Sequence, residues 1–379
     1  MCHRTLLTLG LCLGFIAGTH AWEHVSGDDV QPMIARSDVV AVACDEISRY
    51  IEPEWSTAAA EAPVPLISVD CAASPNICSS YGASSYTIVK LFIRDKEPLG
   101  YVGPRRASAI LTWIARMQRP VVTEVGIEEL DGFKKSDEVV FVAYLDADDG
   151  ASKALFAKVA SQFETEFTFG LTTDIAMLQS EAVTPPSVKC YKPLDGDTHH
   201  LASFVGEEEL SIFIKEASRL VIGELLPHNH QRFLDRGWPM VYVFARTEAE
   251  RAKIADSLRK LARSYYESLT MVMVDPLNFP DLPARLGLEP GVFPAGAVHQ
   301  LSTDKIYPYP KGREITPAEL QGWGLDVWQG RVKPWMPPGV MRSGDGGGVI
   351  GRIQATRKVS MRNLNIPGVN IRVGGRDEL

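Results

Sequence analysis

The stretch Pro294-Ala-Gly-Ala-Val-His299 decides the fold, because two earlier stretches repeat its context. These are Thr87-Ile-Val-Lys-Leu-Phe92 and Pro186-Ser-Val-Lys-Cys-Tyr191. Each starts a short apolar strand that leads through a polar turn to a second strand and then to an amphipathic helix. The openings lie 99 residues apart, from 87 to 186, and then 108 apart, from 186 to 294. Since this spacing suits one small α/β domain per repeat, the sequence predicts tandem α/β domains.

The composition is that of a globular chain with room for several domains. Its 379 residues are 45% hydrophobic and 23% charged, so roughly two to four domains could each bury a core. The net charge of −8 argues against a nucleic-acid partner, whose binding surfaces are usually basic. Beyond the N-terminus no apolar run reaches the length of a membrane span, which argues against a membrane protein.

The N-terminus has the pattern of a secretory signal. A short basic region precedes an apolar stretch, residues 6–17, that is too short to cross a bilayer. Thr19-His-Ala21 fits a cleavage site of small residues, so we expect residues 1–21 to be removed and Trp22 to begin the mature chain. A buried first helix is the alternative.

The last four residues are similar to the Lys/His-Asp-Glu-Leu signal that retrieves proteins of the endoplasmic reticulum (ER). They are Arg376, Asp377, Glu378 and Leu379. Arginine keeps the cation at the first of these positions. Together with the expected signal peptide, this end predicts a protein of the ER lumen that contacts the retrieval receptor.

Four cysteines remain after the expected cleavage, and no two stand three residues apart. Rapid thiol–disulfide exchange needs a low-pKa thiolate with a second thiol close by, as in Cys-x-x-Cys at a helix start. Cys71 and Cys78 enclose six residues after a strand, which predicts a local structural disulfide, with two free buried thiols as the alternative. Cys44 and Cys190 lie in apolar strand-like stretches typical of inert core thiols. No catalytic residue is therefore assigned.

Acidic and histidine clusters do not form a metal or acid–base site in this interpretation. Asp148, Asp149 and residues 207–209 lie at predicted helix starts, where negative charge favours the helix dipole. The histidines fall in connectors or turns, where no carboxylate or cysteine completes a ligand set, so we interpret them as solvated. They are His199, His200, His228 and His230. We expect neither a metal nor a cofactor.

Short motifs in all three units resemble the protein disulfide-isomerase family, with fungal members nearest. The first unit has Val69-Asp-Cys71, Tyr81-Gly-Ala-Ser-Ser-Tyr86 and Tyr101-Val-Gly-Pro-Arg105. The second and third have Phe133-Lys-Lys-Ser-Asp137, Tyr191-Lys192, Phe293-Pro-Ala295 and Gly330-Arg-Val-Lys-Pro334. The resemblance runs from about Ser37 to Pro334. It implies an α/β fold of tandem thioredoxin-like domains, each with a mixed central sheet flanked by helices.

The resemblance also implies a division of the chain. We expect a signal peptide (1–21), a degenerate first thioredoxin-like domain (22–119), a second, non-catalytic domain (120–226), a third, substrate-binding domain (227–333) and a linker with a disordered basic tail (334–379). The first domain is expected to be incomplete, because a central strand and the family's Trp-Cys-Gly-His-Cys segment should fall between Ile51 and Glu54. By the same resemblance, we expect the basic tail to stand in place of the family's last catalytic domain.

Two kinds of site residue follow from the resemblance. The third domain should hold unfolded polypeptide in an apolar groove, for which plain core is the alternative at each candidate position. The candidate lining residues are Val272, Met273, Phe279, Val292 and Phe293. Pro186 and Pro294 match cis-proline positions of the family, whereas Thr87 stands where the first domain should have one.

These observations predict a redox-inactive relative of the isomerases that binds unfolded or nascent secretory polypeptides during oxidative folding. The family implies rearrangement of disulfide bonds, for which this chain has no dithiol. One alternative is a genuine isomerase whose catalytic segment is lost through a splicing or gene-model error. Another is a nonfunctional fragment, because a missing core strand would expose unpaired backbone and apolar surface.

Overall fold

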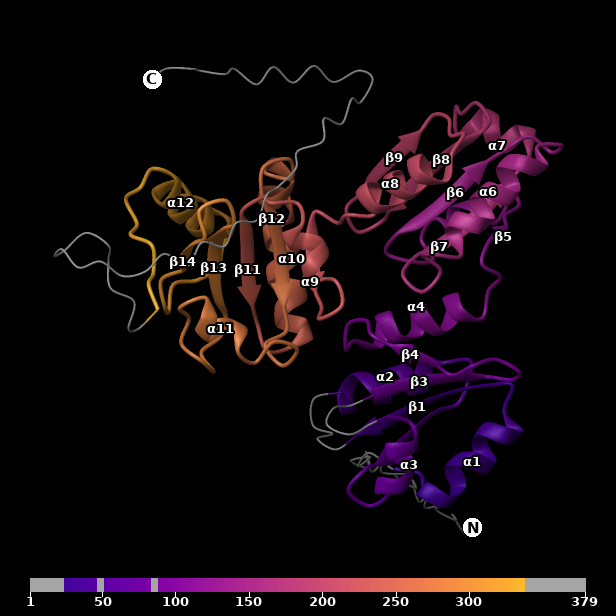
Figure 1. Ribbon diagram of the computed structural model, residues 1–379, viewed down its shortest axis with the longest axis horizontal. Coiled ribbons are helices and arrows are strands. Elements are labelled where there is room, and N and C mark those ends of the chain that lie inside the picture. The colour runs from indigo at the N-terminus through magenta and orange to yellow at the C-terminus, as the bar shows by residue number, and fades with distance from the viewer. Residues whose placement is uncertain (1–23, 46–50, 83–87, 338–379) are drawn as a thin grey trace, which may run out of the picture. The chain divides into compact units, whose positions relative to one another are not determined.

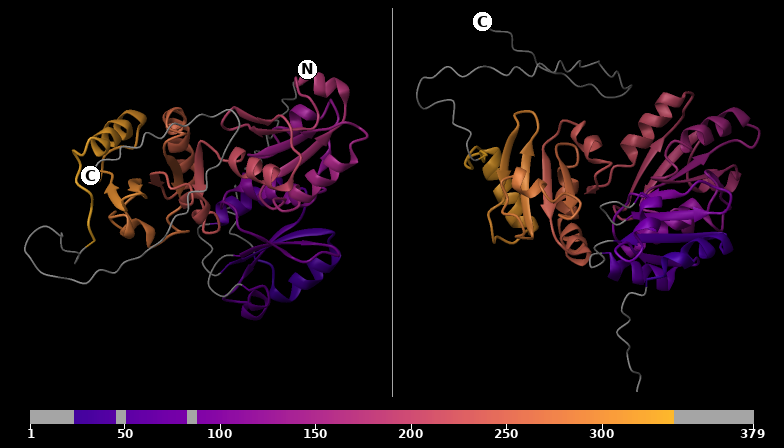
Figure 2. Two further views of the ribbon diagram at one scale, coloured as in Figure 1. Left: turned by 45° about the horizontal axis from the view of Figure 1, so that its top comes forward. Right: turned by 60° about the horizontal axis from the view of Figure 1, so that its bottom comes forward.

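A computed structural model describes residues 24–45, 51–82 and 88–337. Within these ranges the chain forms three mixed sheets with helices packed on their faces (Figure 1). Further views of the same three sheets are given in Figure 2. Several sequence predictions lie outside the described residues: the signal peptide and its cleavage site, the peptide at Thr87, most of the basic tail, and the end Arg376–Leu379.

The second domain has a five-stranded sheet in the order β5-β7-β6-β8-β9. Its strands are β5 (Thr123–Glu124), β6 (Val140–Tyr144), β7 (Thr168–Thr172), β8 (Ser187–Lys192) and β9 (Asp197–Leu201). The first three are parallel, and β8 and β9 are antiparallel to their neighbours. Every residue of β6 is buried, as expected for a central strand covered on both faces.

Two helices cover each face of this sheet. They are α5 (Leu130–Phe133), α6 (Gly150–Ala160), α7 (Ile175–Ser180) and α8 (Glu207–Ala217). Helices α6 and α8 pack against Phe141 and Ala143, and α5 and α7 pack against Val142 and Tyr144. Alternate residues of β6 therefore build two separate hydrophobic layers.

The third domain repeats this topology in the order β10-β12-β11-β13-β14. Its strands are β10 (Ile222–Leu225), β11 (Met240–Phe244), β12 (Thr270–Val274), β13 (Ala295–Gln300) and β14 (Lys305–Pro308). Its helices are α9 (His230–Leu234), α10 (Glu248–Ser264), α11 (Leu282–Arg285) and α12 (Pro317–Trp328). Strand β10 pairs with β12 of this sheet, although the expected division places residues 222–225 in the second domain.

The first domain has four strands, in the order β2-β1-β3-β4. They are β1 (Val39–Asp45), β2 (Leu66–Asp70), β3 (Ile88–Ile93) and β4 (Leu99–Tyr101). The helices are α1 (Gly27–Arg36), α2 (Glu52–Glu61), α3 (Pro75–Ser80) and α4 (Ala107–Met117). Strand β1 pairs in parallel with β2 and antiparallel with β3, so it holds the place that β6 and β11 hold in the other sheets.

This arrangement corrects the expectation of a missing central strand between Ile51 and Glu54. The central strand is β1, and α2 begins at Glu52. What the described residues lack is the outer parallel strand, which is β5 or β10 in the other sheets. Beside β2, the described chain before α1 contributes one backbone hydrogen bond, from the Val25 N–H to the Ser68 carbonyl at 2.8 Å. Within residues 24–45, 51–82 and 88–119, the first sheet thus has its central strand and no outer parallel strand.

Ion pairs with little solvent exposure connect neighbouring domains. Arg116 of α4 pairs with Asp137 at 2.6 Å, and Asp137 also accepts a hydrogen bond from the Thr168 hydroxyl. Arg259 of α10 pairs at 2.9 Å with the fully buried carboxylate of Asp195. Because an unpaired charge at such a position would be costly, these pairs favour one arrangement of neighbouring domains.

Candidate functional site

Each domain contains the same structural position, in which the central strand runs into the following helix. The three connections are Asp45-Glu-Ile-Ser-Arg-Tyr-Ile51, Leu145-Asp-Ala-Asp-Asp149 and Ala245-Arg-Thr247. A helix start stabilises a thiolate, so this is where a dithiol could act. None of the three connections contains a cysteine.

The cysteines of the described chain lie outside these connections. Cys71 and Cys78 form a disulfide bond between the end of β2 and α3. Cys44 and Cys190 are free and buried in β1 and β8. Burial raises the pKa of the Cys44 thiol to about 11 and that of Cys190 to about 12. Both are therefore protonated near neutral pH, the form that does not attack a disulfide.

The peptide bonds before Pro186 and Pro294 are cis. Each lies just before the strand that pairs antiparallel with the central strand, β8 or β13. Pro294 adjoins a cleft of about 360 Å³ in the third domain. The cleft is lined by Arg246, Pro276, Leu277, Pro280, Pro283, Pro290, Gly291 and Phe293. It therefore lies where the Ala245–Thr247 connection, the end of β12 and the cis-proline loop meet.

An aromatic and a cationic side chain meet on one wall of the cleft. The Arg246 guanidinium lies 5.7 Å from the centre of the Phe293 ring, within the range of a cation–π interaction. It also donates a hydrogen bond to the Gly291 carbonyl, which is held in a loop where Gly291 has a φ of +78°. The Phe293 ring packs 6.2 Å from the buried ring of Phe244. These contacts fix Phe293 at the surface of the cleft, where it can offer apolar area to a ligand.

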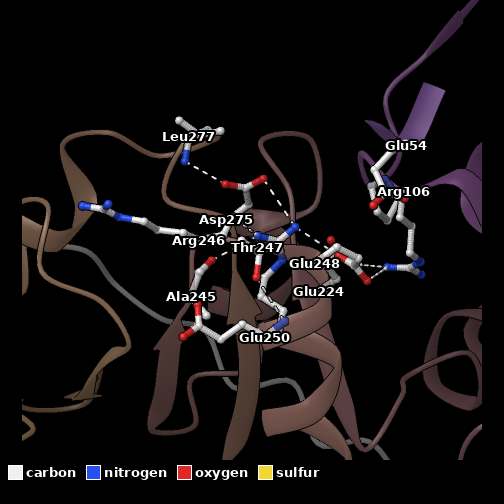
Figure 3. Close-up of polar contacts among 12 residues, drawn as sticks. Glu54, Arg106, Glu224, Ala245, Arg246, Thr247, Glu248, Glu250, Asp275 and Leu277 are labelled. Carbon is white, nitrogen blue, oxygen red and sulfur yellow. Dashed lines mark hydrogen bonds and ion pairs between the residues drawn. The ribbon is translucent and has the colours of Figure 1, made fainter. Parts of the chain in front are cut away.

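A buried arginine holds the connection beside the cleft in place. Arg251 of α10 donates to the carbonyls of Ala245 and Arg246 at 3.0 and 3.1 Å. It also lies 3.6 Å from Asp275, whose carboxylate accepts the Leu277 N–H at 2.9 Å (Figure 3). Thr247 caps α10 by accepting the Glu250 N–H. The backbone on two sides of the cleft is therefore tied to one guanidinium.

The comparisons with known proteins agree with this architecture. The thioredoxin-like domain family matches residues 145–324. The chain is 29% identical over 289 residues to the protein disulfide-isomerase of Humicola insolens, aligning 76% of this chain with 57% of that protein. It is 32% identical over 216 residues to the protein disulfide-isomerase of Alternaria alternata, with coverages of 57% and 49%. Among solved structures, the bb fragment of ERp72 covers 57% of this chain at a TM-score of 0.45 and 14% identity.

Over most of its length the chain is similar to the protein disulfide-isomerases, and residues 145–324 match the thioredoxin-like domain family. It spans about half the length of these curated relatives. Within the described ranges, no helix is both long and apolar enough to cross a membrane.

The structure separates the five candidate residues for substrate binding by this isomerase relative. Phe293 lines the cleft, and Val292 beside it is half-buried. Phe279 is half-buried and packs edge-on against His230 at 5.7 Å. Val272 and Met273 are buried on opposite faces of β12, so both are core residues, not lining. Neighbouring residues of a strand point to opposite faces, and a strand buried on both faces leaves neither accessible.

Sequence reasoning missed most of the cleft. Arg246 lies two residues after the end of β11, and Leu277 lies three residues after the end of β12. Pro276, Pro280, Pro283 and Pro290 follow or flank Leu277. That concentration of prolines was the available signal. His230 also differs from the expected solvated histidine, because it packs edge-on against Tyr242 and Phe279 and burial lowers its pKa.

The acidic clusters serve as helix starts in the structure. Asp149 caps α6 by accepting the Ser152 N–H at 2.9 Å, and residues 207–209 form the first turn of α8. Glu207 additionally pairs with Lys158 at 2.5 Å. Among the residues that the structure describes, no group of three or more His, Cys, Asp or Glu side chains is arranged to hold a metal ion.

Proposed function

We propose that this isomerase relative binds unfolded polypeptides during oxidative folding without exchanging disulfides with them. One observation carries the proposal. At the third connection, where the fold would place a dithiol, the chain has instead a cleft with an exposed apolar wall and no sulfur. The lack of cysteine in all three connections supports the redox-inactive part.

The cleft suits a short apolar stretch of extended chain. Its volume of about 360 Å³ lies at the small end of the range for ligand sites and matches a few side chains. Leu277 is 38% exposed at its rim, and Phe293 offers a ring held by Arg246 and Phe244. The proline rings are rigid, so little conformational entropy is lost when a ligand packs on them.

The client-binding part is tested by suppression of aggregation. Reduced, denatured lysozyme is diluted into buffer with the protein, and light scattering is followed. Phe293→Ala should weaken suppression several-fold, because it removes the aromatic wall of the cleft. Trp328→Ala is the matched control, since Trp328 is 80% exposed on α12 and does not line the cleft. Equal suppression by the wild type and the Phe293→Ala variant would reject this site.

The redox-inactive part is tested by reduction of insulin with a thiol reductant present. Turnover should equal that of the Cys71→Ser/Cys78→Ser variant, because the remaining thiols are buried and protonated. Turnover well above that variant would show that the Cys71–Cys78 pair exchanges with substrates, and would contradict the proposal.

The names of the relatives favour a second candidate, a genuine protein disulfide-isomerase. In that case the Asp45–Ile51 connection would lack residues that the complete protein has, among them a dithiol. Transcript reads across the codons for residues 45–52 decide between the candidates. Additional in-frame codons that encode Cys-x-x-Cys would establish the isomerase, and reads that match this sequence would support the binding protein.

We place the protein in the ER lumen, with the retrieval receptor as a second partner. The expected signal peptide and the end Arg376-Asp-Glu-Leu379 support this localisation. A tagged chain should co-localise with an ER marker, and Glu378→Ala together with Leu379→Ala should release it to the medium. Retention of that variant would argue against the retrieval signal.

A further inference from the structure

Arg106 of the first domain contacts carboxylates from both other domains. It is the N-cap residue of α4, and its side chain is 16% exposed. One terminal nitrogen binds Glu224 of β10, and the other binds Glu138, which precedes β6. The first nitrogen also lies 3.8 Å from Glu248, in the first turn of α10. We call these four residues the Arg106 cluster.

The charges of the Arg106 cluster do not balance. Three carboxylates surround one guanidinium, and those of Glu224 and Glu248 are only 19% and 22% exposed. Arginine stays protonated and offers several donors in a planar fork, so it can hold more than one carboxylate. Without it, the sheltered Glu224 carboxylate would lose its ion pair and face Glu248, which keeps Arg251 as a partner, and Glu138, which is 40% exposed. Leaving a buried carboxylate without a partner is costly. The arrangement therefore depends on this one side chain.

The Arg106 cluster is connected to the cleft by a chain of polar contacts. Glu248 pairs with Arg251 at 3.0 Å, and Arg251 lies 3.6 Å from Asp275. Figure 3 shows this chain running from Arg106 through the start of α10 to the N–H of Leu277, which Asp275 accepts. Two cleft residues are thus bound through their backbones to the last members of this series of contacts. Arg251 donates to the Arg246 carbonyl, and Asp275 accepts a hydrogen bond from the Leu277 N–H.

The start of α4, which carries Arg106, is held within the first domain. The N–H of Ala107, next to Arg106, donates at 2.8 Å to the carboxylate of Glu54 in the first turn of α2. Helix α2 follows the Asp45–Ile51 connection, which has no cysteine. The start of α4 is therefore held by the element that would carry the dithiol in a catalytic domain.

We propose that Arg106 is a positioning residue through which the first domain holds the cleft of the third domain in its binding shape. The first domain then serves the binding function as a structural arm, although it has no dithiol of its own. The coupling between Arg106 and the shape of the cleft is inferred from the contacts alone. Its effect on the binding of unfolded polypeptides rests on the proposed function.

The test compares Arg106→Ala with Arg94→Ala in the full chain. Arg94 pairs with Asp38 at the exposed surface of the same domain, with side chains 55% and 81% exposed. Hydrogen exchange is measured by mass spectrometry in peptides covering 245–251 and 275–279. Arg106→Ala should speed exchange in both peptides by at least about tenfold, because losing one partner of a sheltered ion pair leaves the opposing charge buried and unpaired. Arg94→Ala should change neither, and Arg106→Lys should fall between them.

A second readout separates this inference from the proposed function. Binding of fluorescein-labelled, reduced and carboxymethylated α-lactalbumin is followed by fluorescence anisotropy. Faster exchange with weaker binding supports both ideas. Faster exchange with unchanged binding supports the coupling and contradicts the cleft as the client site. Unchanged exchange in Arg106→Ala overturns the coupling, whatever the affinity.

The variant could also act by unfolding the first domain, and a second variant covers that case. Exchange in β1 and β2 reports on the fold of the first domain. Glu224→Gln together with Glu138→Gln removes two of the three carboxylate charges that face Arg106, and Glu248 stays, without altering the first domain. This double variant should also speed exchange in 275–279, by a smaller factor, and no change there would overturn the proposal.

Discussion

The first and third domains share a sheet topology but differ in the features built on it. In each, the last helix presents a tryptophan to a tyrosine that follows or ends the second hairpin strand, with ring centres 5.0 Å apart for Tyr101–Trp113 and 5.2 Å for Tyr309–Trp323. The third domain has five strands and a cleft, whereas the first has four described strands and a disulfide bond. The difference teaches that the central layers of this fold persist when the edge strand and the chemistry of the connection change.

The largest expected effect compares the two tryptophans. Trp113→Ala or Trp323→Ala should lower the free energy of unfolding of its domain by about 3–5 kcal/mol, since both indoles are 3% exposed. Single domains have only about 5–15 kcal/mol in total, and the four-stranded first domain should lie low in that range. We therefore expect Trp113→Ala to unfold the first domain and Trp323→Ala to leave the third folded.

Hydrogen exchange in β1 and β11 measures both outcomes in the full chain. Two domains that respond equally would show that the shorter sheet is not the less stable one.

The disulfide bond supplies the next effect and should act on the first domain alone. Cys71 and Cys78 are separated by seven positions, and a loop of this size is worth about 2–3 kcal/mol in the chain-entropy account. Cys71→Ser together with Cys78→Ser should lower the urea midpoint for β2 peptides and leave β12 peptides unchanged. A matching shift in β12 would mean that the bond supports the two domains together.

The second domain should differ from the other two in how its stability depends on pH, because of Glu181. The Glu181 carboxylate pairs with Lys134 and Lys189 and accepts the Tyr191 hydroxyl. Burial opposes its ionisation, but these hydrogen bonds prevail and lower the pKa of Glu181 from 4.5 to about 2. A depressed carboxyl pKa contributes stability that is present above pH 4.5 and is lost as the pH falls toward 2.

We expect this loss to be about 2 kcal/mol for the second domain, measured by urea unfolding at pH 6 and pH 2.5. Glu181→Gln should flatten the dependence, and Glu208→Gln, at an exposed position of the same domain, should not. A Glu181→Gln variant with the wild-type pH profile would contradict this assignment.

The smallest effect distinguishes equivalent helix starts. Thr316 caps α12 by accepting the Glu319 N–H, whereas Arg106 at the start of α4 makes no such bond. Thr316→Ala should therefore cost the third domain about 1 kcal/mol, and Thr316→Ser should restore most of it. Thermal unfolding followed by circular dichroism is sufficient. A loss in both variants would point to the threonine methyl group and not to the cap.

The sequence predicted the central elements well because their signal is local. Ile88–Ile93, Ser187–Lys192 and Ala295–Gln300 form where the three repeated apolar stretches indicate. Helix α1, which contains Pro32, was not predicted. The expectation of a missing central strand was wrong, because an apolar run does not show whether its strand lies at the centre or the edge of a sheet.

The candidate site was only partly predictable. Phe293 could be named because it precedes the proline of the third repeat, and the expected cis bonds before Pro186 and Pro294 are present in the structure. Val272 and Met273 have the composition of a binding surface but lie in a strand covered on both faces. Arg246 and Leu277 become neighbours only when β11 and β12 pair, which no single stretch of sequence encodes.

The two free, buried thiols can report the local opening of the domains that contain them. From residue 22 onward, Cys44 belongs to the first domain, Cys190 to the second, and the third has none. Both are fully shielded, so a maleimide can reach each one only when its own domain opens. The order in which the two acquire a covalent label therefore reports which domain loosens first, without any engineered probe.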